Sequence, residues 1–419
     1  MEYQVSAKSA RIMEALTALA EVQQGLEFLK ADQELAIAEQ LEMVVIKAPT
    51  FHEAERAANY AERLRKLGLE NVHIDNHGNV IGIRPGQGQG PAILIEAHLD
   101  TVFPFEVEIN PVIKEGRIHA PGICDNTRGL AALLAVVRAL NAFGVAHAGD
   151  IYVVGTTREE GMGGLGGMKG FFADNQEKIA ASISIDGAGA ERIVCNATGI
   201  KTMEFSFRGI GGHAYGAFGR VANPVHAAAR AVAKIATLVV PKEPRTTYAV
   251  SMLQAGNPAA IHAIAETAGF AINFRSNSTA ELQKLEQEIF RCVEEACREE
   301  SEFWGMDTIS YEHSYLVDVP AGSQDLNLPI LEAAYCALKH LGLNPTFSKD
   351  GSTNANIPIS LGVPAVCIGR GSLESGVHTT HEWFEIEGAY RCPQEVFLIA
   401  LALSGIVGKT GSVLQPNSH

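Results

Sequence analysis

The chain contains the stretch Ala92-Ile-Leu-Ile-Glu-Ala-His98-Leu-Asp100, a mainly apolar run that ends in a histidine and an aspartate. Apolar runs of this length are typical of strands that are buried on both faces of a parallel sheet. His98 and Asp100 follow the run directly, at the carboxyl end of the predicted strand, which is where open α/β sheets place their ligand sites. The stretch therefore predicts a strand of the core together with one edge of a site.

Similar apolar runs alternate with helical patterns along much of the chain. A segment rich in Ala, Leu and Glu over residues 9–67 predicts two or three amphipathic helices, and residues 128–140 predict another strong helix. This alternation predicts a three-layer α/β domain around a mostly parallel, buried sheet. The predicted strands cover residues 80–83, 92–97, 151–154, 181–185 and 365–368.

A different pattern begins at about Gly199, where the elements follow in the order strand, helix, strand, strand, helix, strand. This order is that of a ferredoxin-like α+β domain. We therefore expect residues 199–314 to form an inserted domain, and residues 1–198 and 315–419 to form together the domain that carries the site. The predicted strands of the inserted domain cover residues 201–210, 247–255, 269–276 and 308–314, and its predicted helices cover residues 224–238 and 280–300.

The charge of the chain restricts its partners. Its 419 residues include 33 Lys and Arg against 48 Asp and Glu, a net charge of -15. This balance disfavours nucleic acids and anionic membranes as partners. The first residues lack the apolar stretch of a signal peptide or a membrane span, so we expect a cytoplasmic protein. The seven scattered cysteines include no Cys-x-x-Cys pair and indicate reduced, structural thiols.

Four further acidic residues follow predicted strands or precede a predicted helix, namely Asp125, Glu159, Glu160 and Asp186. Taken singly, each has an ordinary interpretation as a helix cap, a solvated pair or a turn residue. Together with His98 they converge on one edge of one sheet. Because clustered buried carboxylates repel each other unless cations lie among them, the cluster predicts bound metal.

A later loop, Gly376-Val-His378-Thr-Thr-His381-Glu382, adds two histidines after the predicted strand at residues 365–368. A mixture of histidine and carboxylate ligands suits zinc, with cobalt or manganese as alternatives. Two histidines three positions apart can also lie on the surface without a function. The loop therefore supplies one candidate ligand, and the spacing leaves open which histidine it is.

Seven short pieces of the sequence occur in a characteristic order: His98-Leu-Asp-Thr-Val102, Gly122-Ile-Cys-Asp125, Thr157-Arg-Glu-Glu-Gly161, Ile185-Asp186, Gly211-Gly-His213, Gly351-Ser-Thr353 and His378-Thr-Thr-His-Glu382. They resemble the dinuclear zinc peptidases of clan MH, which include peptidase T, carboxypeptidase G, acetylornithine deacetylase and succinyl-diaminopimelate desuccinylase. The resemblance runs over nearly the whole chain. It implies a metal-dependent hydrolase that cleaves an amide bond.

The resemblance further implies two metal ions, in the first place zinc, that share Asp125 as a bridging ligand. The two implied ligand sets are His98, Asp125 and Asp186 for one ion, and Asp125, Glu160 and His378 for the other. Of the two late histidines, His378 matches the family's ligand because it precedes Glu382 by four positions. His381 is the alternative.

Catalytic roles around the metals are also implied by the resemblance. Asp100 would orient His98, as the outer partners of metal-bound histidines do. Glu159 would be the general base, accepting a proton from the water that bridges the metals and delivering it to the leaving amine. His213, in the inserted domain, would donate a hydrogen bond to the developing oxyanion.

Substrate contacts are implied at three further positions. Arg275 resembles the family's clamp for a substrate carboxylate, a task that suits a planar bidentate donor, and Ser352 and Thr353 belong to a matching piece that contacts substrate. The chain departs from the family pattern at His262, where Asn is common, and at Asn354, where Asp is common, which leaves the substrate open. The family also implies a homodimer that forms through the inserted lid domain.

We therefore expect a zinc-dependent hydrolase of small peptides, similar to di- and tripeptide aminopeptidases. A carboxypeptidase and an N-acyl-amino-acid deacylase use the same machinery and are the alternatives. A more distant alternative is an NAD-binding dehydrogenase, because Gly161-Met-Gly-Gly-Leu-Gly166 matches the dinucleotide fingerprint and Asp186 lies 20 residues beyond it. Against it, Thr157-Arg-Glu-Glu160 separates this motif from the strand, whereas the fingerprint follows its strand at once. A binding module without turnover is disfavoured because Glu159 and all ligand positions are filled.

Overall fold

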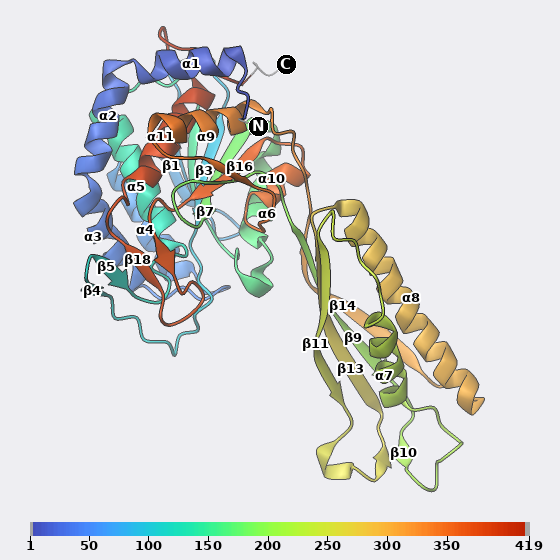
Figure 1. Ribbon diagram of the computed structural model, residues 1–419. Coiled ribbons are helices and arrows are strands. Elements are labelled where there is room, and N and C mark those ends of the chain that lie inside the picture. Colours follow the sequence, from blue (N-terminus) through green and yellow to red (C-terminus); the bar gives the residue numbers. More distant parts are fainter. Residues whose placement is uncertain (1–2, 415–419) are drawn as a thin grey trace. The chain divides into compact units, whose positions relative to one another are not determined.

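Figure 1 shows the computed structural model of the protein, which describes residues 3–414. The outermost residues of the predicted first domain, 1–2 and 415–419, lie outside this range. The chain divides into two compact units. The first unit contains the residues up to Ala197 and those from Ser323 onward, and the second unit contains Thr198–Gly322. The second unit is therefore an insertion in the sequence of the first.

An eight-stranded sheet forms the centre of the first unit. Four neighbouring strands, β6, β3, β7 and β16, run parallel, which confirms the predicted mostly parallel core. Strands β1, β8 and β15 are not predicted from the sequence, because they are short and lack an apolar run. Most side chains of β1 are exposed, and those of β15 are exposed or partly buried. In spatial order the strands are β1 (Glu70–Ile74), β2 (Val80–Arg84), β6 (Ile151–Thr156), β3 (Ile93–His98), β7 (Ala181–Gly187), β16 (Ala365–Gly369), β8 (Arg192–Val194) and β15 (Thr346–Ser348).

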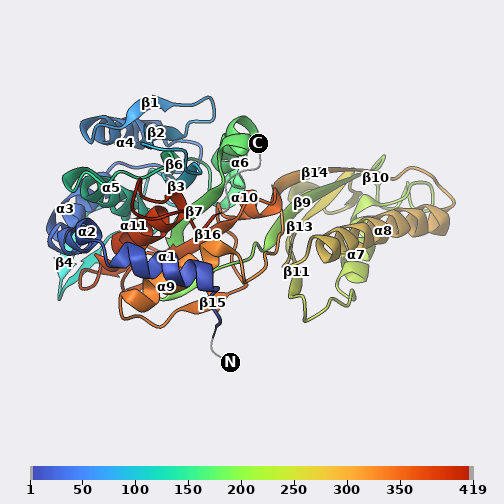
Figure 2. The same cartoon turned by 90° about the horizontal axis from the view of Figure 1, so that it is seen from above.

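Helix α11 packs against α5 and α9, all three helices contact the central strands, and α1, α2 and α3 contact these helices in turn (Figures 1 and 2). Residues 9–67 form four helices and not two or three. The breaks after α1 and α2 are only two residues and one residue long and contain no Gly or Pro, so the sequence does not mark them. The helices of the first unit are α1 (Ala7–Thr17), α2 (Ala20–Ala31), α3 (Gln33–Val44), α4 (Ala54–Lys66), α5 (Thr127–Ala142), α6 (Gly166–Asn175), α9 (Pro329–His340), α10 (Asn356–Ser360) and α11 (Arg391–Ser404).

The alternation of side chains along β3 separates the core from the site. Ile93, Ile95 and Ala97 join the large apolar cluster that includes α5 and α11. Glu96 and His98 therefore point to the opposite face of the sheet, because successive side chains of a strand alternate. A second, four-stranded sheet lies in the first unit and consists of β17 (Glu374–Ser375), β18 (Trp383–Glu385), β5 (Arg117–His119) and β4 (Val112–Lys114).

The second unit has the predicted ferredoxin-like order, with an antiparallel sheet in the spatial order β11, β13, β9, β14. Helices α7 and α8 pack on one face of this sheet, around a cluster rich in phenylalanine (Figure 1). Strand β14 continues past the expected boundary at Ser314, because Tyr315–Val319 also pairs with β9. The elements are β9 (Gly199–Arg208), β10 (Gly212–His213), α7 (Pro224–Ile235), β11 (Thr246–Ala255), β12 (Ala263–Ile264), β13 (Thr267–Ser276), α8 (Thr279–Trp304) and β14 (Ser310–Val319).

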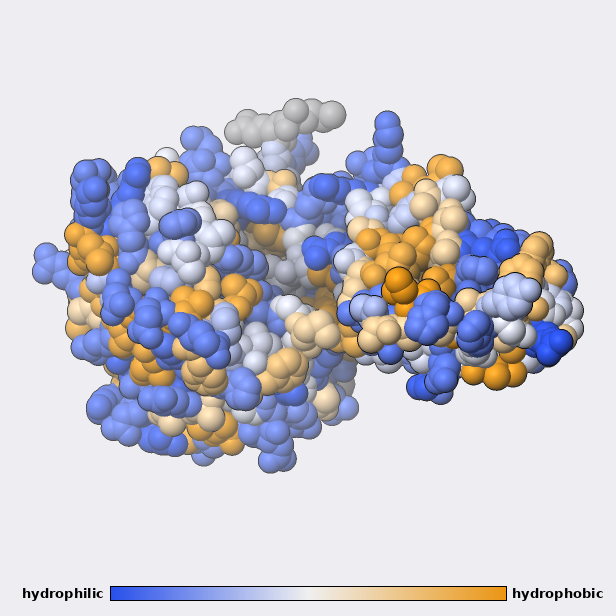
Figure 3. Space-filling model, turned by 90° about the horizontal axis from the view of Figure 1, so that it is seen from below, coloured by the Kyte–Doolittle hydropathy of each residue, from blue (hydrophilic) through white to orange (hydrophobic). Residues whose placement is uncertain are grey.

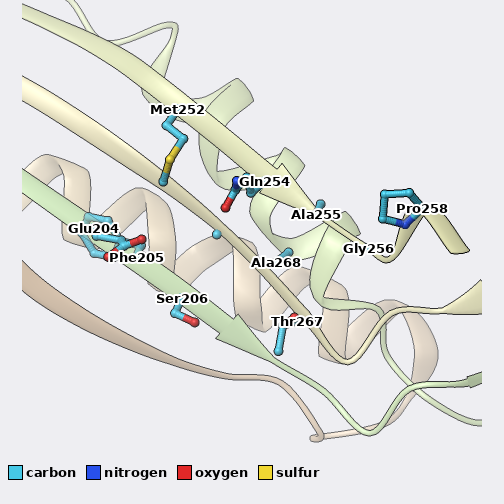
Figure 4. A pocket seen from close by; sticks show the side chains of 11 residues that line it. Glu204, Phe205, Ser206, Met252, Gln254, Ala255, Gly256, Pro258, Thr267 and Ala268 are labelled. Carbon is cyan, nitrogen blue, oxygen red and sulfur yellow. The ribbon is translucent and has the colours of Figure 1, made fainter. Parts of the chain in front are cut away.

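The second unit also contains a hollow on its sheet, shown in Figure 4, with a volume of about 470 Å³. Residues of β9, β11 and β13 line it, among them Glu204, Met252 and Gln254.

Over the described residues, none of the helices has the length and apolar character needed to cross a membrane.

Candidate dinuclear metal centre

The structure brings the five predicted metal ligands together at the carboxyl ends of the parallel strands. His98 ends β3, Asp186 lies near the end of β7, and Glu160 follows β6. Asp125 comes from the turn before α5, and His378 from the loop after β17. Their donor atoms form two groups of three, each with all its atoms within 4.8 Å of one another. The two groups are His98, Asp125 and Asp186, and Asp125, Glu160 and His378.

Asp125 belongs to both groups and directs its two carboxylate oxygens to different histidines. Its Oδ1 lies 2.9 Å from Nε2 of His98, and its Oδ2 lies 3.3 Å from Nε2 of His378. His98 Nε2 is also 3.6 Å from Asp186 Oδ1, and His378 Nε2 is 2.9 Å from Glu160 Oε1. One carboxylate therefore joins two donor sets, as a bridging ligand would.

The chemistry of these donors fits divalent metal ions. Asp125 and Glu160 are each only 7% exposed, and His98 is 1% exposed. Buried carboxylates at such short separations are unfavourable unless positive charge lies among them. Imidazole nitrogens combined with carboxylate oxygens are the donors that zinc, cobalt and manganese accept. The described residues can thus hold two ions in adjacent positions.

The ring of His98 is oriented by Asp100, chiefly through the backbone. His98 Nδ1 lies 3.0 Å from the carbonyl oxygen of Asp100 and 3.5 Å from its carboxylate Oδ1. Because a carbonyl oxygen only accepts, we assign the proton to Nδ1, which leaves the Nε2 lone pair facing Asp125 and Asp186. The predicted contact between His98 and the Asp100 carboxylate is therefore longer than the contact between His98 and the Asp100 carbonyl oxygen.

The carboxylate of Asp100 instead holds the segment that carries the predicted general base. It accepts hydrogen bonds from the backbone N–H groups of Glu159 and Glu160, each at 3.0 Å, and from the Thr50 hydroxyl at 2.9 Å. Burial alone would raise the pKa of Asp100, but His98 and these N–H groups lower it. Asp100 therefore stays ionised and fixes the backbone at Glu159.

Glu159 lies beside the donor sets and belongs to neither of the two that share Asp125. It forms a third close group of donors with His98 and Glu160, and it is 9% exposed. Burial, followed by the charge of Asp186, raises the pKa of Glu159 well above its ordinary value. A carboxylate whose pKa is raised in this way suits proton transfer near neutral pH.

Glu382 supports the bridging residue, a role that sequence reasoning missed. Its carboxylate accepts hydrogen bonds from the backbone N–H groups of Gly122 at 2.9 Å, Cys124 at 2.7 Å and Asp125 at 3.1 Å. These bonds fix the turn that presents Asp125. In the sequence, the position of Glu382 four residues after His378 is the signal that could have pointed to this role.

Arg370 is a second residue that sequence reasoning missed. Its Nη2 lies 2.8 Å from Asp186 Oδ1 and 3.1 Å from Asp125 Oδ1, and its Nη1 donates to Glu374 Oε1 at 2.5 Å. Burial alone would lower the pKa of Arg370, but these three carboxylates raise it well above its ordinary value. A fixed positive charge therefore touches two of the predicted ligands.

The late loop distinguishes between its two histidines. His378 has a positive φ of 66° and is half-exposed, and its ring faces Asp125 and Glu160. His381 is exposed and, among the described residues, joins none of the groups that could hold a metal ion. The geometry therefore favours His378 over His381.

The remaining predicted residues lie outside these donor groups. His213 and Arg275 are exposed residues of the second unit, and the backbone of the departure His262 pairs with the turn after His213. Ser352 and Thr353 lie in the first unit, before α10. Asn354, the other residue that departs from the family pattern, is buried and donates hydrogen bonds to the side chains of Glu96 and Thr156.

Comparisons with known proteins agree with this geometry. The pattern that defines Peptidase family M20/M25/M40 matches residues 94–400. Carboxypeptidase G2 of Pseudomonas sp. (strain RS-16) is 29% identical over 231 residues, which cover 50% of this chain and 53% of that protein, so this chain spans about half the length of that relative. Succinyl-diaminopimelate desuccinylase of Leptothrix cholodnii is 28% identical over 273 residues, or 59% of this chain and 70% of that protein.

A solved structure extends the likeness to the fold. Aminopeptidase PepT from Bacillus cereus ATCC 10987 has 23% sequence identity and a TM-score of 0.73, and the match covers 88% of this chain and 97% of that one. At this identity the likeness concerns the fold alone. Since the family pattern spans most of the sequence, including every predicted metal ligand, the chain belongs to Peptidase family M20/M25/M40.

Proposed function

We propose that this metallohydrolase cleaves the amide bond of small peptides in the manner of a di- or tripeptide aminopeptidase. The observation that carries the proposal is the pair of donor sets that share Asp125, with the buried Glu159 beside them. A dehydrogenase is not supported, because the chain belongs to a peptidase family and Glu159 and Glu160, which precede the glycine motif, lie in the cluster of metal-binding donors.

Two zinc ions are the cofactors that we propose, with cobalt or manganese as alternatives. The sets His98, Asp125, Asp186 and Asp125, Glu160, His378 would hold them. Bound ions of this kind lower the pKa of a water molecule and polarise the carbonyl of a scissile amide. The purified protein is expected to contain up to two ions per chain by elemental analysis, and a chelator is expected to remove its activity. Full amidase activity in the metal-free protein would contradict this assignment.

The residues of the chain supply the proton transfers and the orientation. Glu159 takes the proton of the attacking water while the oxygen adds to the carbonyl carbon, and then gives that proton to the amine nitrogen as the C–N bond breaks. Asp100 keeps Glu159 in place through the backbone. We further propose that His213 donates to the oxyanion, and that Arg275, Ser352 and Thr353 bind polar groups of the substrate.

The substrate class needs a direct experiment, because the relatives' names divide among an aminopeptidase, a carboxypeptidase and a desuccinylase. A mixed library of dipeptides, tripeptides and N-acetyl amino acids, offered in competition and followed by mass spectrometry, separates these alternatives. Unblocked di- and tripeptides should be consumed first, with release of the amino-terminal residue. Preferential consumption of the N-acetyl amino acids would make the protein a deacylase instead.

We propose that the second unit is a lid and that it forms a homodimer. Its edge strand β11 is exposed from Ser251 to Ala255, and an edge strand offers unpaired N–H and C=O groups with which another chain can pair. Figure 3 shows apolar side chains gathered on part of this unit, and Tyr215, Val239 and Ile261 are among its most exposed residues. Analytical ultracentrifugation of the protein with and without residues 199–314 tests the dimer.

Substitution of Arg275 tests the proposed clamp. Arg275 is exposed and its Nε donates to Asn273 at 3.1 Å, so the guanidinium is held at one nitrogen and can offer the others to a substrate carboxylate. Because a hydrogen bond to a charged group contributes about 1.5–3 kcal/mol, Arg275→Ala should raise KM for a dipeptide roughly 10-fold or more. Arg291→Ala, which removes an exposed arginine paired within α8, is the control. Unchanged KM and kcat in Arg275→Ala would exclude the clamp.

A further inference from the structure

Two residues at the border of the site have a left-handed backbone although neither is glycine. Phe51 has a φ of 74° and Arg158 a φ of 54°. Such conformations are unfavourable for residues with bulky side chains and persist only when the surrounding structure holds them. Arg158 directly precedes Glu159, and Phe51 directly follows Thr50, whose hydroxyl donates to Asp100. Both unfavourable turns therefore adjoin the machinery proposed above.

A single buried carboxylate oxygen holds both turns. Oε1 of Glu53 accepts hydrogen bonds from the backbone N–H of Phe51 at 3.0 Å and from the backbone N–H of Arg158 at 2.9 Å. Glu53 is 6% exposed, whereas Phe51 is 56% exposed, so packing of the phenyl ring cannot fix the turn. The carboxylate of Glu53 is thus a buried contact that both turns share and that opposes relaxation of these two residues.

The Arg158 turn leaves little space for another backbone path. The Arg158 carbonyl accepts the N–H of Gly166 at 3.0 Å, and a Cβ atom at Gly163 would lie 2.6 Å from that carbonyl oxygen. On the far side of the turn, Asp100 accepts the N–H groups of Glu159 and Glu160. Glu53 and Asp100 therefore fix three consecutive N–H groups, those of residues 158, 159 and 160.

We propose that Glu53 is a positioning residue for the hydrolysis reaction, acting through Arg158 on the orientation of Glu159. The inference rests on the proposed role of Glu159 as general base. Glu53 itself contributes to none of the donor groups found among the described residues that could hold a metal ion. Its loss should consequently lower kcat while the metal content and KM stay close to those of the unchanged protein.

Two substitutions at Glu53 separate the acceptor from the charge. Glu53→Gln keeps an oxygen that can accept both N–H groups and should retain a kcat within about 3-fold, since positioning rather than charge is required. Glu53→Leu removes the acceptor and should lower kcat about 10-fold to 100-fold, because misplacement of a catalytic group by 1 Å can cost about 100-fold. Glu55→Leu, on the exposed side of α4, is the matched control and should not change kcat.

Arg158→Gly supplies a test that depends on the proposed mechanism and not on general stability. Glycine adopts the left-handed conformation without a steric penalty, so the turn depends less on Glu53 to hold it. In the Arg158→Gly background, Glu53→Leu should change log kcat by less than half as much as it does in the otherwise unchanged protein. If Glu53→Leu does not fold, Glu53→Asp, which withdraws the oxygen by one methylene, is compared in the same two backgrounds.

Three results would overturn the inference: a loss of kcat in Glu53→Gln as large as in Glu53→Leu, equal losses with and without the Arg158→Gly substitution, or a loss of metal that accounts for the loss of kcat. Normal turnover by Glu159→Ala would instead refute the proposed function. An inactive Glu159→Ala combined with any of the three results would refute only the role of Glu53.

Discussion

Replacement of Glu159 by alanine is expected to abolish turnover and to leave the metal content unchanged. Glu159 is not a member of either of the two ligand sets that share Asp125, so its carboxylate is available for proton transfer. Loss of a general base typically lowers the rate about 100-fold to 10,000-fold. Single-turnover assays on a dipeptide and elemental analysis of the same preparation measure both quantities.

Asp125→Ala provides the contrasting variant, because Asp125 directs one oxygen to His98 and the other to His378. Its removal takes a donor from both sets at once, so metal and activity should be lost together. The control is Asp174→Ala, an exposed acid at the end of α6. Metal depletion in Glu159→Ala as severe as in Asp125→Ala would show that the roles of Glu159 and Glu160 are interchanged.

The convergence of the site could be predicted from the sequence because of the topology of parallel strands. His98 and Asp186 each follow an apolar run, and parallel neighbours end at the same edge of a sheet. β3 and β7 are such neighbours. The resemblance to a known family then distinguished Glu159 from Glu160, a choice that the spacing of two adjacent acids leaves open.

The support of the site could not be predicted in the same way. Glu382 contacts backbone N–H groups around Asp125 that lie more than 250 positions away in the sequence, and Arg370 reaches Asp125 and Asp186 from beyond β16. Such contacts depend on how loops close over the sheet, which apolar periodicity does not encode. Glu53 has no pattern of its own, since the left-handed φ of Phe51 and Arg158 is unexpected for these residue types.

Arg370→Met is expected to destabilise the metal-free protein far more than the zinc-loaded protein. Nη2 of Arg370 lies within 3.1 Å of carboxylate oxygens of both Asp125 and Asp186, and Arg370 is 3% exposed. Removal of one partner from a buried ion pair typically costs about 3–5 kcal/mol, because the other charge stays buried without compensation. Urea unfolding of the protein after chelation should show a loss of this size.

Added zinc should restore much of that stability, because divalent ions bound by the same carboxylates supply the missing positive charge and bind only the folded state. Arg370→Lys keeps the charge but loses the planar fork that reaches Asp186 and Glu374 together. The stability of its metal-free form should therefore lie between those of the unchanged protein and of Arg370→Met.

Arg128→Met is the matched control for this comparison. Arg128 is also fully buried, but it donates to the carbonyl oxygens of Arg370 and Ala389 and not to carboxylates. Its loss should therefore destabilise the metal-free and zinc-loaded proteins by similar amounts. If Arg370→Met behaves like Arg128→Met, with the same loss of stability in both states, then Arg370 does not neutralise Asp125 and Asp186.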